Sequence, residues 1–63
     1  MTRYNNTKQG FQQEVTSDGA TFTATVTNVV TGASKVSGGW KSYQVALWEV
    51  RDMWTAAVQE SRK

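Results

Sequence analysis

Glu49 and Asp52 are a pair of acidic residues whose type and spacing could support metal binding or acid–base catalysis. Three positions apart on a helix, two carboxylates lie on the same side. Arg51 stands between them and the sequence offers no third ligand, so we interpret the pair as part of a solvated helix face. The chain has no His and no Cys, which most often supply a general base, a thiol nucleophile or a soft metal ligand. We therefore expect a protein that is not an enzyme and that has no catalytic residue, no metal site and no cofactor.

The threonines at alternate positions between residues 21 and 27 offer a second kind of chemistry, hydrogen bonding from one face of a strand. Such a row is common on a solvated sheet face, because Thr favours strands. A sheet can also enter the major groove of DNA, where Thr, Gln and Lys reach base edges and phosphates. On this hypothesis the DNA contacts come from hydrogen-bonding and basic side chains, namely Arg3, Lys8, Gln12, Thr23, Thr25, Thr27, Lys35 and Lys41.

The distribution of charge favours the DNA-binding hypothesis. Seven Lys and Arg residues against five Asp and Glu residues give a net charge of +2. The surplus lies within residues 1–41, and the charges after residue 41 cancel. The charged residues of the first part are Arg3, Lys8, Lys35 and Lys41 with Glu14 and Asp18. Because DNA phosphates attract cations, we predict a small domain that binds double-stranded DNA through its outer sheet face and a basic N-terminal arm.

Trp48 favours a different function. It lies roughly 140° from the centre of the apolar stripe of the predicted helix, so we expect it to be exposed unless the helix is rotated or the ring lies flat on its own surface. Trp is frequent among the residues that dominate protein interfaces. The alternative hypothesis is therefore a small phage-type protein-binding modulator or a self-associating module. Its contact residues are Val45, Trp48, Arg51 and Asp52.

The elements that position these residues begin after a polar segment. Residues 1–9 have no hydrophobic period, so we expect a flexible basic arm followed by one domain over residues 10–63. Asp18-Gly19 favours a two-residue hairpin turn that pairs Val15 with Phe22. With this pairing one sheet face is apolar apart from Gln13, and its other members are Phe11, Val15, Phe22, Ala24 and Val26.

The second hairpin is predicted from Gly32. A three-residue loop over residues 30–32, with Gly32 in a left-handed conformation, pairs Val26 with Val36 and Thr27 with Lys35. This register places Val36 in the core and Lys35 on the outer face. A two-residue loop over residues 31–32 would place Val36 outside.

The remaining sequence predicts a helix. Gly38-Gly39 ends the sheet, and Ser42 is the expected N-cap of a helix that runs to about Glu60. Its apolar stripe would cover the sheet, and Trp40 would close one end of the core. The stripe contains Tyr43, Ala46, Leu47, Val50, Trp54, Ala57 and Val58, with Met53 at its edge. The predicted fold is α+β, a three-stranded antiparallel meander packed against one C-terminal helix (βββα).

Residues 22–50 resemble the amino-terminal arm-type DNA-binding domain of the tyrosine recombinases of phages and transposons. The resemblance rests on Thr31-Gly32 as a hairpin turn, on the segment Gly39-Trp40-Lys41-Ser42 and on Ala46 early in the helix. It implies a three-stranded sheet on a C-terminal helix, with the exposed sheet face in the major groove and a basic arm along the DNA backbone. Double-stranded RNA-binding domains are also similar in their C-terminal half, but this chain lacks their first helix.

The length of the chain limits what its core can supply. A domain of 63 residues buries only about 60% of its unfolded surface. The sequence contains no run of about 18 apolar residues, and its start has no apolar signal-peptide segment. We therefore expect a soluble cytoplasmic protein with no membrane contact and no small-molecule substrate, whose partner is DNA, another protein or a second copy of the chain.

Overall fold

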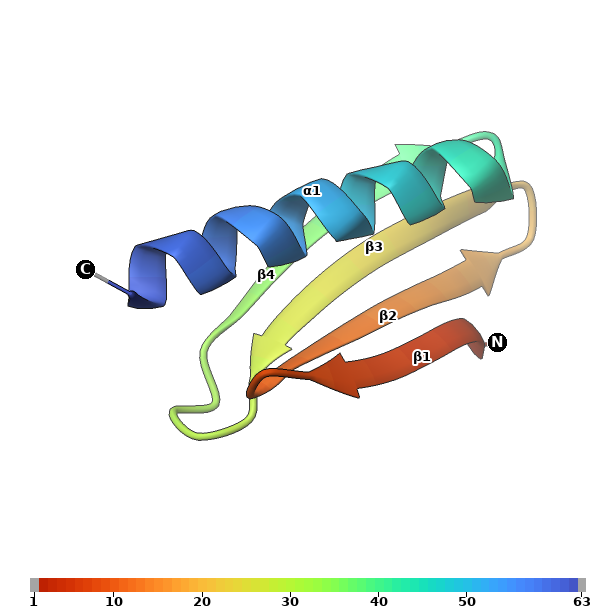
Figure 1. Ribbon diagram of the computed structural model, residues 1–63. Helices are drawn as coiled ribbons and strands as arrows, with labels where there is room; N and C mark the ends of the chain where they lie inside the picture. The colour runs from red at the N-terminus through yellow and green to blue at the C-terminus, as the bar shows by residue number, and fades with distance from the viewer. Residues whose placement is uncertain (1, 63) are drawn as a thin grey trace.

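The computed structural model describes residues 2–62 and shows a four-stranded antiparallel sheet with one helix across it (Figure 1). The strands are β1 (Thr2–Lys8), β2 (Phe11–Asp18), β3 (Thr21–Asn28) and β4 (Ser34–Trp40), and the helix is α1 (Tyr43–Ser61). The strands lie in the order β1-β2-β3-β4, so each one pairs with its neighbour in sequence. Helix α1 packs over β2, β3 and β4, whereas β1 lies at the sheet edge away from it. The α+β class is as predicted.

The prediction of three strands is wrong, because β1 occupies the segment that was expected to be an arm. Gln9 and Gly10 form a two-residue turn with φ angles of 53° and 80°, which aligns Lys8 with Phe11. Positive φ at both central residues defines a type I′ turn, whose twist suits a hairpin. Strand β1 is held largely by backbone pairing with β2, and only Tyr4 of this strand packs against the core.

The hairpin of β2 and β3 differs from the prediction by two residues. Its turn is Gly19-Ala20 instead of Asp18-Gly19, so Val15 pairs with Ala24 instead of Phe22. Gly19 has a φ of 70° at the first turn position, as glycine does in type II′ turns. A shift of two residues leaves every side chain on its predicted face, because side chains alternate along a strand.

The hairpin of β3 and β4 differs from the prediction by one residue, and this changes the faces of β4. The Asn28 carboxamide oxygen accepts hydrogen bonds from the backbone N–H groups of Val30 (2.9 Å) and Thr31 (3.2 Å). These bonds stabilise a longer loop, in which the Asn28 N–H donates to the carbonyl of residue 33 (2.8 Å). Lys35 therefore pairs with Val26 on the helix side. Val36 lies outside, 64% exposed, so its predicted place in the core is wrong.

The core lies between the sheet and α1, on the predicted sheet face and helix stripe. Val15 and Val50 are fully buried at its centre, and the Phe22 and Tyr43 rings meet edge to face at 6.0 Å between centroids. The buried apolar residues are Phe11, Val15, Ala24, Val26, Ala46, Val50 and Val58. Tyr4, Phe22, Trp40, Tyr43, Leu47, Met53, Trp54 and Ala57 pack around them and are partly buried.

Ser42 is the N-cap residue of α1, as predicted. Its backbone is extended, with φ −129° and ψ 135°, and its carbonyl accepts the first helical hydrogen bond from the Ala46 N–H at 3.1 Å. The Ser42 side chain makes no capping hydrogen bond. The start of the helix is therefore determined by the packing of Tyr43 and Ala46 on the sheet and by the chain direction after β4.

The faces on which two valines lie predict that their truncation lowers the free energy of unfolding by different amounts. Val15→Ala removes fully buried methyl groups and should lower the free energy of unfolding by about 2 kcal/mol. Val36→Ala removes the same groups from the outer face and should change it by less than about 0.5 kcal/mol. Urea unfolding followed by circular dichroism measures both. Equal losses would mean that Val36 is a core residue after all.

Candidate functional site

The outer face of the sheet carries the predicted row of hydrogen-bonding residues. Thr25 pairs with Glu14 and Thr27 pairs with Gln12, so these four residues lie side by side on the face opposite the buried residues of β2 and β3. Thr23 continues the row next to Thr16. Several members bond within this face: the Gln12 side-chain amide donates to the Asn5 carboxamide oxygen (3.0 Å), and the Thr2 hydroxyl donates to the Glu14 carboxylate (3.1 Å).

The basic residues predicted to contact DNA do not gather on the outer face. Lys35 is on the helix side, where its ammonium is 3.8 Å from the Glu60 carboxylate. Lys8, which pairs with Phe11, is also on the helix side, and its ammonium is 5.8 Å from the centroid of the Trp54 ring. Arg3 is exposed at an irregularity in β1, and Lys41 follows the end of β4. The outer face carries the carboxylates of Glu14 and Asp18. The predicted place of Lys35 among the threonines is wrong, and Lys8 lies in a strand and not in a flexible arm.

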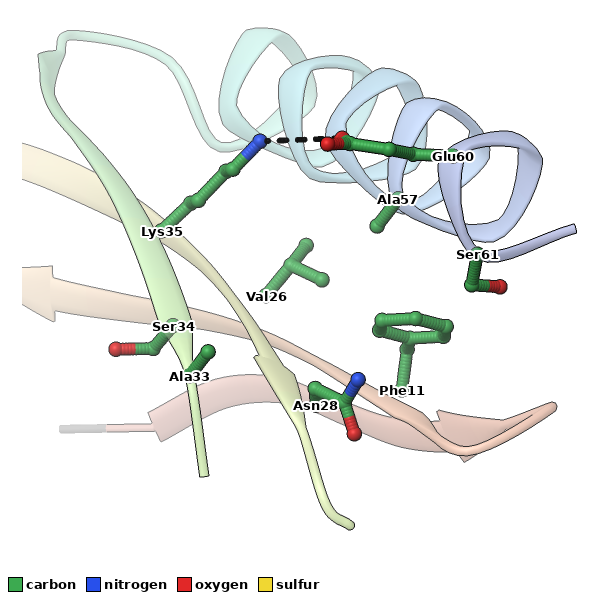
Figure 2. A pocket seen from close by; sticks show the side chains of 9 residues that line it. All are labelled: Phe11, Val26, Asn28, Ala33, Ser34, Lys35, Ala57, Glu60 and Ser61. Carbon is green, nitrogen blue, oxygen red and sulfur yellow. Dashed lines mark ion pairs between the residues drawn. The ribbon is translucent and has the colours of Figure 1, made fainter. Parts of the chain in front are cut away.

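A pocket of about 280 Å³ lies between β4 and the C-terminal half of α1 (Figure 2). Phe11, Val26 and Ala57 form its apolar floor and wall, and the ion pair of Lys35 with Glu60 crosses its mouth. The two charged side chains are exposed, and such pairs contribute little to stability. Lys35 is therefore part of the rim of an apolar pocket and is engaged with a carboxylate.

A second cleft, of about 340 Å³, lies between β1 and α1, where the helix no longer covers the sheet. Strand β1 contributes alternate residues, as the period of a strand requires, and α1 contributes residues spaced by three and four. We name it the β1–α1 cleft. It is lined by Tyr4, Asn6 and Lys8 from β1, Gln13 from β2, and Leu47, Arg51, Trp54 and Thr55 from α1.

Trp54 fixes the distance between the two walls of the β1–α1 cleft. Its indole N–H donates a hydrogen bond to the backbone carbonyl of Lys8 at 3.0 Å, across 46 residues of sequence. The Lys8 ammonium lies over the same ring, within the range of a cation–π contact. Beyond this point the Arg62 guanidinium donates to the Gln9 carboxamide oxygen at 3.4 Å. The end of β1 is thus bound to the helix by side chains.

The β1–α1 cleft has a positive electrostatic character. Lys8 and Arg51 line it, and none of the residues found to line it carries a carboxylate. Within residues 2–62 the one ion pair is that of Lys35 with Glu60, on the opposite side of the helix, so neither Lys8 nor Arg51 is neutralised by direct pairing there. The remaining lining groups are two amides, two aromatic rings, a hydroxyl and Leu47. This combination can hold an anion and a flat, hydrogen-bonding group together.

The structure brings together residues that the sequence assigned to different partners. Lys8 was predicted to contact DNA and Arg51 to contact a protein, yet both line the β1–α1 cleft. Trp48 is 56% exposed and Val45 is 36% exposed, which confirms the predicted exposure, and Asp52 is exposed beside them. Trp48 lies three residues before Arg51 on the helix but is not among the residues that line the cleft.

Six lining residues were not predicted as site residues, namely Tyr4, Asn6, Gln13, Leu47, Trp54 and Thr55. Tyr4 and Asn6 were assigned to the arm, Gln13 was a polar exception in an apolar face, and Trp54 was assigned to the core. The Gln9-Gly10 turn is the signal that identifies residues 2–8 as a strand, since an X-Gly pair between two extended segments favours a hairpin. With β1 in place, the alternation of Tyr4, Asn6 and Lys8 puts them on the face of Gln13.

The fold and the site define a four-stranded antiparallel meander under one helix, with a basic cleft at the uncovered edge. Comparison with protein-family models, with curated proteins and with solved structures finds no match to this chain. No helix within residues 2–62 is long and apolar enough to cross a membrane.

The hydrogen bond from Trp54 to the Lys8 carbonyl predicts that Trp54→Phe lowers stability more than Trp48→Phe does. Trp54→Phe removes the indole donor and part of a packed ring, and should lower the free energy of unfolding by about 1–2 kcal/mol. It should also speed hydrogen exchange of the β1 amides. Trp48→Phe is the matched control and should change stability by less than about 0.5 kcal/mol. If both variants exchange their β1 amides at the wild-type rate, Trp54 does not hold β1 in place.

Proposed function

We propose that this protein is a small non-enzymatic module that binds nucleic acid through the β1–α1 cleft. The observation that carries the proposal is the meeting of Lys8 and Arg51 on one cleft with no carboxylate among its lining residues. Phosphates are attracted to such a site, and the two aromatic rings beside the cations offer stacking surfaces to bases. The chain's net charge of +2 acts in the same direction.

The outer sheet face supports DNA binding less well than the cleft. It retains Gln12, Thr23, Thr25 and Thr27 as hydrogen-bonding groups. Glu14 and Asp18 on the same face repel phosphates, and Lys8 and Lys35 point to the other side of the sheet. Because Lys35 points to the helix side, the outer face lacks the basic side chain that was predicted among its threonines, and attraction to phosphates supplies most nucleic-acid affinity. The proposal therefore keeps the predicted class of partner and moves its binding surface.

Salt dependence of binding tests the proposed function. If Lys8 and Arg51 each contact one phosphate, the logarithm of the association constant should fall with the logarithm of salt concentration with a slope of about −1.4 for a single strand and −1.8 for a duplex. Lys8→Gln and Arg51→Gln should each weaken binding and reduce the slope by about 0.7–0.9. Fluorescence anisotropy of labelled oligonucleotides over a range of KCl concentrations measures both quantities.

Lys35→Gln is the matched control, because Lys35 lies on the opposite side of α1 and is engaged with Glu60. It should leave both affinity and slope unchanged. The absence of binding by the wild-type protein at low salt would refute the proposal, and so would a loss of affinity in Lys35→Gln as large as that in Arg51→Gln.

A second candidate function rests on the exposure of Trp48. An indole that is 56% exposed beside the partly exposed Val45 forms an apolar patch on the outer side of the helix. Trp is enriched at the centres of interfaces, and a core of this size gains from association. The alternative proposal is therefore a module that binds a second copy of itself through Val45 and Trp48, with Asp52 at the edge of the contact.

Sedimentation velocity tests self-association. Trp48→Ala should lower the sedimentation coefficient from that of a dimer to that of a monomer and leave the circular dichroism spectrum unchanged. Val30→Ala is the control, since Val30 is an exposed apolar residue in the loop between β3 and β4, remote from the helix face. A wild-type protein that remains monomeric at high concentration would exclude this second function.

A further inference from the structure

Gln13 occupies an unusual place for an amide side chain. It lies between Phe11 and Val15 on the sheet face that packs against α1, and only 5% of its surface is exposed. Within residues 2–62 its side chain makes no hydrogen bond. The stem of Gln13 is therefore packed on the core-facing side of the sheet, while its amide has no partner among the described residues.

The free groups of Gln13 open to the β1–α1 cleft. Gln13 lines that cleft, and no side-chain nitrogen or oxygen of the described chain is both fully buried and without a partner. The amide thus keeps a small exposed area, and the cleft is where it does so. The donor and acceptor of the Gln13 amide are therefore accessible to a ligand in the cleft.

Asn6 adds a second amide at the same place. It pairs directly with Gln13 across β1 and β2 and also lines the cleft. On the outer face two diagonal neighbours of the same strands, Gln12 and Asn5, are joined by a hydrogen bond of 3.0 Å. Among residues 2–62 no such bond joins Asn6 to Gln13. The two sides of the same hairpin therefore differ, and the cleft side is the one whose amides are left for a ligand.

The groups around Gln13 match one nucleobase with its phosphates. An amide presents a donor and an acceptor side by side and can bind a base edge through two hydrogen bonds. Tyr4 and Trp54 supply aromatic surface for the base, and Lys8 and Arg51 supply charge for the flanking phosphates. A volume of about 340 Å³ lies at the lower end of the range of small-ligand pockets, about 300–1,000 Å³. It suits a single base and is too small for a duplex.

We infer that the β1–α1 cleft accepts one unpaired base of a single-stranded nucleic acid and that the Gln13 amide contacts the edge of that base. This inference rests on the proposed function and adds the form of the nucleic acid. In a duplex the base is stacked and its pairing edge is occupied, and removing it from the stack costs a few kcal/mol. Single strands offer the edge and the ring face directly.

The test compares single strands with duplexes and Gln13 with an apolar residue of similar shape. Labelled DNA strands of about ten nucleotides, as four homopolymers and as a mixed sequence, are titrated by anisotropy alongside the mixed-sequence duplex. The wild type should bind its preferred single strand about tenfold or more tightly than the duplex. Gln13→Met should lose about tenfold in that affinity and reduce the differences between homopolymers.

Thermal unfolding supplies a readout that separates binding from structure. Gln13→Met places an apolar side chain of similar shape on the core-facing side of the sheet, so it should keep or raise the melting temperature while it weakens binding. Gln12→Met on the outer face is the matched control and should leave binding unchanged. A Gln13→Met variant that binds single strands as tightly as the wild type would overturn the inference. If the wild type binds single strands and duplex equally, and this affinity is lost in Lys8→Gln and Arg51→Gln, the inference is overturned and the proposed function stays intact. If the wild type binds no oligonucleotide, the inference and the proposed function are both overturned.

Discussion

The structure depends on one geometric constraint: a single helix must cover the apolar face of a sheet that is wider than the helix. An α-helix with its side chains is about 10–12 Å across, and four strands spaced by about 4.8 Å span more than that. Helix α1 therefore packs over β2, β3 and β4 and leaves the helix-facing side of β1 partly open. The largest side chains that are fully buried are consequently those of Val15 and Val50, and the aromatic residues of the core remain partly accessible. The β1–α1 cleft lies along the uncovered side of β1, and β1 contributes mostly polar residues to it.

The amino-acid pattern was sufficient for the helix and for the buried faces of β2 and β3. The alternation of β2 and β3 identified the buried face even though the predicted pairing differed by two residues, because a shift of two preserves the direction of each side chain. In β4 the difference was one residue and reversed the face of Lys35 and Val36. The cause was the Asn28 carboxamide, which accepts two loop N–H groups and lengthens the turn. A local side-chain bond of this kind leaves no trace in hydrophobic periodicity.

The candidate site was predictable only in part, for a related reason. Strand β1 has no apolar alternation, since one of its faces is open to the outside and the other borders a polar cleft. Only its Gln9-Gly10 turn marks it as a hairpin. Lys8 and Arg51 were both singled out from the sequence, but their meeting depends on β1 and on the bond from Trp54 to the Lys8 carbonyl. Gln13 is recognisable from the sequence as the polar residue of an apolar face, but its place in the cleft depends on β1 and α1.

The 46-residue separation between Trp54 and Lys8 has a consequence for how the protein is made. One wall of the β1–α1 cleft comes from residues 4–13 and the other from residues 47–55, so the cleft has both walls only when nearly the whole chain is available. During synthesis the strands emerge first and can pair locally as hairpins, because their turns are short. Contacts with the helix are the long-range ones and come later. A nascent chain would therefore hold a paired β1 before it holds a complete cleft, and the cleft would gain its second wall only after α1 has docked.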